Sequence, residues 1–532
     1  MIFFCNTSLF VSLILRSSII LPHASSCKKI SKHITQNRLL EVPLIFNLVI
    51  SKGIKHKLLY FTFLSLVVAD LTFSFLQHYN QPLDGDMSWH IIPARVLEPV
   101  LENPLGFDVL LMHHSYPNPN RFFSHWSIKR FYDTTPIYLQ RFVSPIDSLY
   151  LSSALLKTAI QLFLIYFLSL FISGTWRVQK LNFIIASVLV FPLFQTNGYQ
   201  GYMGIIDMSP TYTFFYALPF LMLLTYSIPL LVESRSSTKP EFRILLRILF
   251  IPIGLVCSLS GPLNPGIILI VTVLLYLKYI KKGYLKSAFQ VPLKRMVDGV
   301  REIPMHFWFY LIPISIFSMY SLYIGSYNSN NQALPLKELY SNLPAGIYFQ
   351  FTQKLGMPIL LISILLNIIL LKTKNKNGEV RELLTIYKWI GLFSIVYIIL
   401  LPLGGSREYR PNVLRYDTII PITFCLMYIF GSSSFYLINS LTKNQLNLYI
   451  PFLLGILLIF TYADKAQFDK NSCERETLKQ LSESKEDLVQ IPADCKLLSW
   501  GRILDPKESE LNAEFLFRCG ITNKRILYFN KH

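Results

Sequence analysis

The sequence predicts an all-α polytopic membrane protein with about eleven transmembrane helices. Apolar residues make up 52% of the 532 residues, charged residues only 15%, and the mean hydropathy is +0.42. In ordinary soluble proteins about a quarter of the residues are charged. Disordered chains combine low hydrophobicity with high charge density. The formal net charge of +19, from 50 Lys and Arg against 31 Asp and Glu, therefore indicates a membrane rather than a nucleic acid as the partner.

A transmembrane helix needs about 20 mostly apolar residues. Eleven stretches approach this length: 58–76, 149–173, 181–196, 211–232, 247–260, 266–279, 306–323, 356–371, 388–404, 417–438 and 447–463. Only Gly-Pro-Leu-Asn-Pro-Gly at residues 261–266 separates the fifth stretch from the sixth, and this hexapeptide does not continue a helix. We expect two spans joined by a tight turn here; one discontinuous helix is the alternative.

Lys and Arg in the short loops predict the orientation, because they gather on the cytoplasmic side. Taken alternately along the chain, one set of short loops carries 19 Lys and Arg, whereas the other carries five. Seven further positive charges lie within residues 28–57, before the first span. The prediction is therefore a cytoplasmic N-terminus and, after eleven spans, a C-terminus on the outer side.

Four segments follow from this topology. Residues 1–54 are a cytoplasmic or non-native N-terminal extension, with a cleaved signal peptide as the alternative. Residues 55–463 are the transmembrane domain, and residues 77–148 form a large first outer loop within it. Residues 464–532 form a small extracytoplasmic α/β domain with 12 Lys and Arg and 12 Asp and Glu, so the surplus of positive charge lies before it.

Three cysteines, Cys473, Cys495 and Cys519, lie in this C-terminal segment. An oxidising exterior permits one disulfide among them, and three pairings are open. We expect Cys495–Cys519. Cys257 and Cys425 fall inside spans, where cysteine behaves as a small apolar packing residue.

The first outer loop carries an acidic turn, Asp84-Gly-Asp86, soon after the first span. Two carboxylates spaced this way can bind a divalent cation such as Mg²⁺ or Mn²⁺, or one of them can deprotonate a hydroxyl nucleophile. A solvated Asp-Gly turn is the alternative. Asp207, in a later outer loop, is a candidate second acidic residue, and the alternative there is a helix cap.

The same outer loop is rich in aromatic and basic side chains, among them Trp89, His90, Arg121 and His125. Aromatic residues with arginine are typical of segments at the membrane interface, and they also suit a saccharide or phosphate site. Inside the first two spans, Asp70 and Lys157 are charges at similar depths and could pair, but we expect instead that each reaches the membrane surface or has a structural partner of its own.

A second basic cluster, Arg407, Arg410 and Arg415, lies in a short loop on the predicted outer side. Arginines there go against the charge bias that orients the chain. Because arginine binds phosphate with two parallel hydrogen bonds, a lipid phosphate or diphosphate is a natural partner. Internal pairing with Glu408, Asp417 or the acidic residues of the first outer loop is the alternative.

This arrangement resembles the GT-C superfamily of membrane glycosyltransferases, which includes protein O-mannosyltransferases, oligosaccharyltransferase catalytic subunits and lipid A aminoarabinose transferases. The resemblance rests on the cytoplasmic start, the number of spans, the outer C-terminal domain and Asp84-Gly-Asp86 close after the first span. The sequence departs from the pattern in lacking an Asp-Glu pair at this position and a Trp-Trp-Asp motif in the tail.

The resemblance implies sugar transfer from a polyprenyl-phosphate or polyprenyl-diphosphate donor at the outer face. It implies Asp84 or Asp86 as base or metal ligand, Asp207 as a further acidic contributor, and Arg407, Arg410 and Arg415 as phosphate contacts. Stretches such as DGDMSWHIIPA are similar to those of bacterial membrane proteins, which implies a bacterial inner membrane. A transporter or flippase for an anionic lipid or envelope glycan, and a non-catalytic scaffold, are the alternatives.

Overall fold

The computed structural model describes residues 52–233, 240–286, 291–332, 334–373, 378–405, 407 and 412–531. Almost the whole predicted N-terminal extension, residues 1–54, lies outside them. Eight helices of the described chain are long and apolar enough to cross a membrane. They are His56–Tyr79, Pro145–Ser173, Pro210–Glu233, Met305–Gly325, Gly356–Thr373, Gly378–Gly404, Ile420–Ser440 and Lys443–Ala463.

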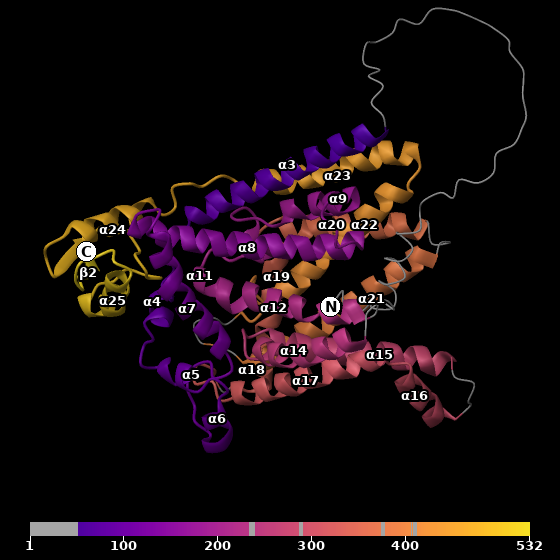
Figure 1. Cartoon of the computed structure of the whole chain (residues 1–532), viewed down its shortest axis with the longest axis horizontal. Helices are drawn as coiled ribbons and strands as arrows, with labels where there is room; N and C mark the ends of the chain where they lie inside the picture. Colours follow the sequence, from indigo (N-terminus) through magenta and orange to yellow (C-terminus); the bar gives the residue numbers. More distant parts are fainter. Residues whose placement is uncertain are drawn as a thin grey trace, which may run out of the picture.

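These eight spans lie along the long axis of the molecule (Figure 1). Their labels are α3 (Lys52–Tyr79), α8 (Pro145–Ser173), α11 (Pro210–Tyr212) continued by η2 (Thr213–Ala217), α12 (Leu218–Tyr226) and α13 (Ile228–Glu233), α17 (Met305–Gly325), α20 (Gly356–Thr373), α21 (Gly378–Leu400) with η3 (Leu401–Gly404), α22 (Ile420–Ser440) and α23 (Lys443–Ala463). The protein is therefore a helical multi-pass membrane protein, as predicted.

The other three predicted spans are also helical, but they are not among these eight. One is the short α9 (Leu181–Val190) with η1 (Phe191–Leu193). The other two are α14 (Pro240–Ser258) and α15 (Asn264–Lys286), which are separate helices rather than one discontinuous helix. Gly261 between them has φ +65°, a left-handed backbone conformation that glycine adopts without steric cost. The predicted count of about eleven thus corresponds to eight full-length apolar helices and three others.

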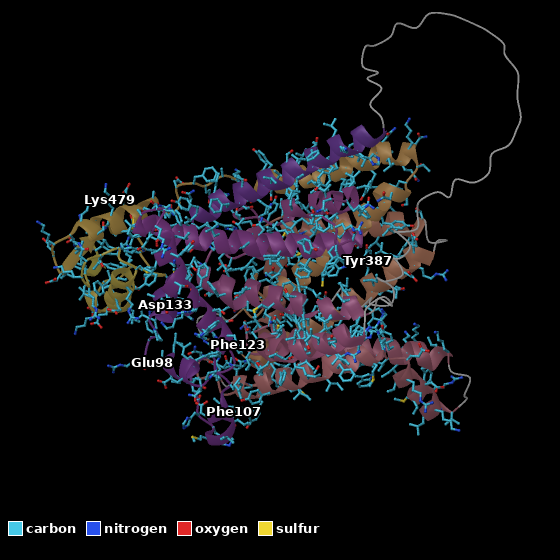
Figure 2. All side chains as sticks on the ribbon, viewed as in Figure 1. Glu98, Phe107, Phe123, Asp133, Tyr387 and Lys479 are labelled. Atoms are coloured by element: carbon cyan, nitrogen blue, oxygen red, sulfur yellow. A yellow bond between two sulfur atoms is a disulfide. The ribbon has the colours of Figure 1, made fainter. Side chains whose placement is uncertain are left out.

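The first loop, residues 80–144, is a folded layer rather than an open connector. It contains α4 (Met87–Ile91), α5 (Glu98–Glu102), α6 (Phe107–Met112) and α7 (Phe122–Leu139). The remaining helices are α10 (Gln200–Met203), α16 (Pro292–Arg301), α18 (Leu336–Ser341) and α19 (Leu343–Thr352). Exposed Phe107 projects from the loop layer at α6, whereas Tyr387 lies within the helix bundle and hydrogen-bonds Ser432 (Figure 2).

The tail, residues 464–531, contains α24 (Ser472–Glu483), β1 (Leu488–Ile491), η4 (Pro506–Ser509), α25 (Glu510–Arg518) and β2 (Leu527–Asn530). The two strands pair in parallel, with Leu488 opposite Leu527 and Ile491 opposite Asn530. At one end of the molecule the tail shares an apolar core with α4, α7 and α8 (Figure 1). Buried side chains of this core include Met87, Leu149, Leu478, Phe515 and Tyr528.

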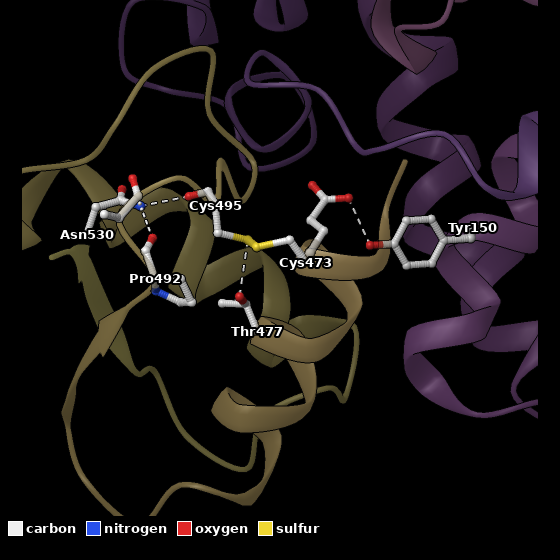
Figure 3. Close-up of a disulfide and its surroundings, with 8 residues drawn as sticks. Tyr150, Cys473, Thr477, Pro492, Cys495 and Asn530 are labelled. Atoms are coloured by element: carbon white, nitrogen blue, oxygen red, sulfur yellow. Dashed lines mark hydrogen bonds between the residues drawn. A yellow bond between two sulfur atoms is a disulfide. The ribbon is translucent and has the colours of Figure 1, made fainter. Parts of the chain in front are cut away.

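The expected disulfide is wrong, whereas Lys157 has structural partners of its own, as expected. The disulfide joins Cys473 to Cys495, and Cys519 is a buried free thiol, because α24 places Cys473 beside the segment that follows β1 (Figure 3). Lys157 does not pair with Asp70. Its ammonium group donates instead to the side-chain oxygen of Gln81, at 2.9 Å, and to the backbone oxygen of Met208.

Candidate functional site

A cavity of about 910 Å³ lies where the loop layer, the tail and the ends of the spans meet. Lining residues come from four stretches of chain that are distant in the sequence: residues 82–97, 117–121, 207–216 and 415–417. Asn330, Arg407, Lys470 and Trp500 complete the lining. Of the predicted site residues, Asp84, Asp86, Trp89, His90, Arg121, Asp207, Arg407 and Arg415 all line this one cavity. Arg410 lies outside the described residues.

Asp84 is buried in the cavity wall, and four donors surround its carboxylate. One oxygen accepts hydrogen bonds from the Ser209 hydroxyl and the Thr211 amide, both at 2.8 Å. The other accepts from the Thr211 hydroxyl at 2.8 Å and from the Asp86 amide at 2.9 Å. Burial raises the pKa of Asp84, and the hydrogen bonds from Thr211 and Ser209 oppose that rise. The carboxylate thus fastens the turn after α3 to the start of the span at Pro210.

Asp86 is held differently, since only one of its carboxylate oxygens accepts a hydrogen bond from a described residue. The indole Nε1 of Trp500 donates to Oδ1 at 2.9 Å. Oδ2 accepts none within the described chain, and the side chain is half-buried and lines the cavity. Of the two carboxylates in the Asp84-Gly-Asp86 turn, Asp86 is therefore the one with an oxygen available to a ligand or to a proton.

Asp207 is the third carboxylate of the cavity wall. The Ser209 amide donates to its Oδ1 at 2.7 Å. Burial raises the pKa of Asp207 to about 6, although this hydrogen bond opposes the rise. The neighbouring Met208 carbonyl accepts from Lys157, so the ammonium group of α8 ties down the loop that carries Asp207. The side chain thus titrates close to neutral pH.

The arginines of the predicted phosphate cluster differ in their partners. Arg415 forms two hydrogen bonds of 3.0 Å with the buried carboxylate of Asp417, which is the internal pairing considered above. Arg407 donates to the side-chain oxygen of Asn118 at 3.1 Å. Asn118 belongs to the first outer loop and also lines the cavity. Arg407 and Arg121 both line the cavity, and their guanidinium groups contribute positive charge to it.

His90 and His125 form a stacked pair, with ring centroids 4.9 Å apart and an angle of 16° between the rings. Phe215 packs edge-on against both rings. Burial lowers the pKa of both imidazoles, so both are neutral at neutral pH. His90 Nδ1 lies 2.7 Å from the Asp86 carbonyl oxygen and must donate to it, which leaves Nε2 as an acceptor. His90 lines the cavity, whereas His125 lies behind it.

Asp84 does not suit a Mg²⁺ or Mn²⁺ site. A carboxylate offers about four lone-pair positions, and the four donors around Asp84 already fill them. Across the described ranges, no group of three or more His, Cys, Asp or Glu side chains is arranged to hold a metal ion. The expected metal-ligand role is therefore not supported for Asp84.

Two cavity residues, Trp500 and Lys470, were not predicted, and both come from the tail. The Trp500 ring stacks on Tyr212, with centroids 6.0 Å apart and 24° between the planes. Lys470 donates to the side-chain oxygen of Asn197 at 2.5 Å. The only signal in the sequence was that Trp500 and Lys470 belong to the tail, which is predicted to lie on the same side of the membrane as the acidic turn.

No protein-family model matches the chain, and comparisons with curated proteins and with solved structures find no similar protein. The class that the fold defines is that of helical multi-pass membrane proteins. The wall of the chain's largest described cavity combines carboxylates, arginines and aromatic rings.

Proposed function

We propose that the protein is a membrane glycosyltransferase that moves a sugar from a polyprenyl-phosphate or polyprenyl-diphosphate donor to an acceptor hydroxyl at the outer face of the membrane. One observation carries the proposal: Asp86, Asp207, Arg121 and Arg407 line the same cavity at one end of the helix bundle. A transfer of this kind needs a base for the acceptor and positive charge for the departing phosphate, and the cavity offers both.

Asp86 is the proposed base. Its free Oδ2 takes the proton from the acceptor hydroxyl while the acceptor oxygen attacks C1 of the sugar. The bond between C1 and the phosphate oxygen breaks, and the lipid phosphate leaves with the bonding electron pair. The positive charges of Arg121 and Arg407 stabilise that anion. Configuration at C1 inverts, because attack and departure take place on opposite faces of the ring.

Asp84 has a structural part in this proposal, because its oxygens are occupied by Ser209, Thr211 and Asp86. Arg415, paired with Asp417, shapes the cavity wall rather than binding phosphate directly. Asp207 is the second acidic contributor. It lies on the loop joined to Asp84 through Ser209.

The test is transfer from a panel of undecaprenyl-phosphate hexoses and pentoses by the purified, reconstituted full chain. Asp86→Asn should reduce the rate by about 10²–10⁴-fold, the usual contribution of a general base. Asp133→Asn is the matched control, since Asp133 is exposed on α7 and pairs with Lys129 outside the cavity. Transfer by Asp86→Asn at the wild-type rate overturns the assignment of the base.

The phosphate subsite has its own test. Arg407→Ala should weaken binding of undecaprenyl phosphate about tenfold or more, because it removes a charged hydrogen-bonding group from the cavity. Arg95→Ala is the control, as Arg95 is exposed and does not line the cavity. Movement of the lipid-linked sugar across the bilayer, without transfer to any acceptor, would favour the transporter over the transferase.

A further inference from the structure

The indole of Trp500 reaches the acidic turn from a part of the chain more than 400 residues away. Its Nε1 donates to Asp86 Oδ1 at 2.9 Å, with a sequence separation of 414. Trp500 belongs to the tail, in the segment between β1 and η4. The tail therefore supplies the one described side chain that hydrogen-bonds the Asp86 carboxylate.

The backbone of the tail lies directly against Gly85. A Cβ atom on Gly85 would lie 2.5 Å from the Trp500 backbone nitrogen and 2.8 Å from the Ser499 carbonyl carbon. Such contacts involve backbone atoms, so no side-chain rotation relieves them. Glycine between the two aspartates thus permits the approach of the tail, which gives the Asp-Gly-Asp pattern a packing reason independent of metal binding.

Two further contacts hold the tail on either side of this point. Glu474 of α24 accepts a hydrogen bond from the Leu83 amide at 2.9 Å, just before the turn. Asn512 of α25 hydrogen-bonds the Ser88 hydroxyl, just after it. Both Glu474 and Asn512 are buried. The position of Trp500 is therefore fixed by contacts on both sides rather than by its own hydrogen bond alone.

The Trp500 ring is also part of the cavity surface. One face stacks on Tyr212, yet 53% of the side chain is exposed. The same indole thus combines a donor directed at a carboxylate with an aromatic surface open to the cavity.

We propose that Trp500 is the positioning residue for Asp86, and that docking of the tail completes the site. The proposal rests on the function proposed above in giving Asp86 the role of base. The indole N–H fixes the carboxylate through Oδ1, which directs Oδ2 to the acceptor hydroxyl.

The first experiment measures the carboxylate itself and needs no transfer assay. Asp86 in the full chain is labelled at pH 6 with a water-soluble carbodiimide and glycine ethyl ester, and its modification rate is followed by peptide mass spectrometry. A carboxyl oxygen adds to the reagent, so the rate reports how firmly the Asp86 carboxylate is held. Trp500→Phe, which keeps an aromatic ring but loses the donor, should raise the Asp86 rate about tenfold, as expected for loss of a hydrogen bond to a charged group.

Trp126→Phe is the matched control, since Trp126 is 50% exposed on α7 and does not line the cavity. It should leave the rate unchanged. Gly85→Ala is a second variant that keeps the indole and displaces it through the backbone, and it should raise the rate in the same direction. An Asp86 rate equal to wild type in Trp500→Phe overturns the proposal.

Transfer kinetics supply the second readout. Trp500→Phe should lower kcat about tenfold or more while KM changes by less than about threefold, because the substituted group orients the base rather than binding substrate. If the wild-type chain transfers no sugar, the glycosyltransferase proposal fails while the labelling result still decides whether Trp500 positions Asp86. If transfer is present and Trp500→Phe keeps the wild-type kcat, the positioning role fails alone.

Discussion

Asp84 and Thr211 are joined by two hydrogen bonds of 2.8 Å, one from the Thr211 amide and one from its hydroxyl. The two residues lie 127 positions apart, one in the turn after α3 and the other in the first turn of the span Pro210–Glu233. A carboxylate at a helix start satisfies amides that have no partner within the helix, and it interacts favourably with the helix dipole. Asp84 therefore acts as a remote cap that holds two walls of the cavity together.

We expect substitution of Asp84 to lower the stability of the protein, because four donors hold its carboxylate. We expect substitution of Asp86 to lower transfer activity with little effect on stability. Asp84→Asn places an amide NH₂ group among four donors and should lower the free energy of unfolding by about 2–3 kcal/mol. Asp86→Asn should change it by less than about 1 kcal/mol, since that side chain is half-buried and has one hydrogen bond. Thermal unfolding of the detergent-solubilised chain measures both.

Thr211 gives the matched pair for the same prediction. Thr211→Val keeps the shape of the side chain and removes its hydroxyl, so it should cost about 1 kcal/mol or more. Thr211→Ser keeps the hydroxyl and should cost less than Thr211→Val. Equal stability of Asp84→Asn and wild type would show that the hydrogen bonds between Asp84 and Thr211 contribute nothing to the free energy of unfolding.

The helical class was predictable because hydrophobic span length is a local property of the sequence. All eleven predicted stretches are helical, and residues 261–266 do separate two helices. What differs is the number that are long and apolar enough to cross a membrane, which is eight among the described residues. One of the other three, α9 with η1, runs for only 13 residues from Leu181 to Leu193.

The site was predictable by residue type more than by role. The predicted site aspartates and arginines that the structure describes do line one cavity, but the partners that separate Asp84 from Asp86 are Ser209, Thr211 and Trp500. Serine and threonine are common residues, and neither they nor a single tryptophan carry a spacing signal across hundreds of residues. The Cys495–Cys519 expectation was wrong for the same reason, as only the fold places Cys473 at Cys495.

The Cys473–Cys495 bond should stabilise the tail against unfolding. It closes a loop with a sequence separation of 22, and chain entropy for such a loop amounts to about 3 kcal/mol. Replacing both cysteines by serine should lower the unfolding temperature, and adding reductant to this variant should lower it no further. Cys519→Ser serves as the control for the loss of a tail cysteine. If reductant leaves the wild-type unfolding temperature unchanged, the bond contributes no stability.

Glu474 makes stability depend on pH. Its buried carboxyl accepts from the Leu83 amide and the Tyr150 hydroxyl, each at 2.9 Å, and burial raises its pKa to about 8. In the unfolded chain the pKa is near 4.5, so the folded state binds more protons between these values. The stabilisation is therefore complete below about pH 4.5 and is lost as pH rises through 8.

Comparison of variants isolates this carboxyl from other titrating groups. Glu474→Gln keeps an acceptor for both donors and removes the titrating group. Between pH 5 and 8.5 the free energy of unfolding should therefore fall less in Glu474→Gln than in wild type. The difference between the two falls should be on the order of 2–4 kcal/mol. Glu474→Ala leaves the Leu83 amide and the Tyr150 hydroxyl without this acceptor and should be less stable throughout. Parallel pH curves for wild type and Glu474→Gln would contradict the raised pKa.

The tail and α16 should lie on opposite sides of the membrane. They occupy opposite ends of the long axis along which the spans run (Figure 1). Helix α16 lies in the basic segment that the sequence assigns to the cytoplasm, and Leu293 on it is 71% exposed. A membrane-impermeant maleimide added to intact cells should therefore label Lys507→Cys, which is exposed in the tail, but not Leu293→Cys.

Both variants should be labelled in permeabilised cells, and the wild-type chain corrects for labelling of native thiols. Labelling of Leu293→Cys alone would invert the topology and move the cavity to the cytoplasmic face, where an outer-face glycosyltransferase cannot work.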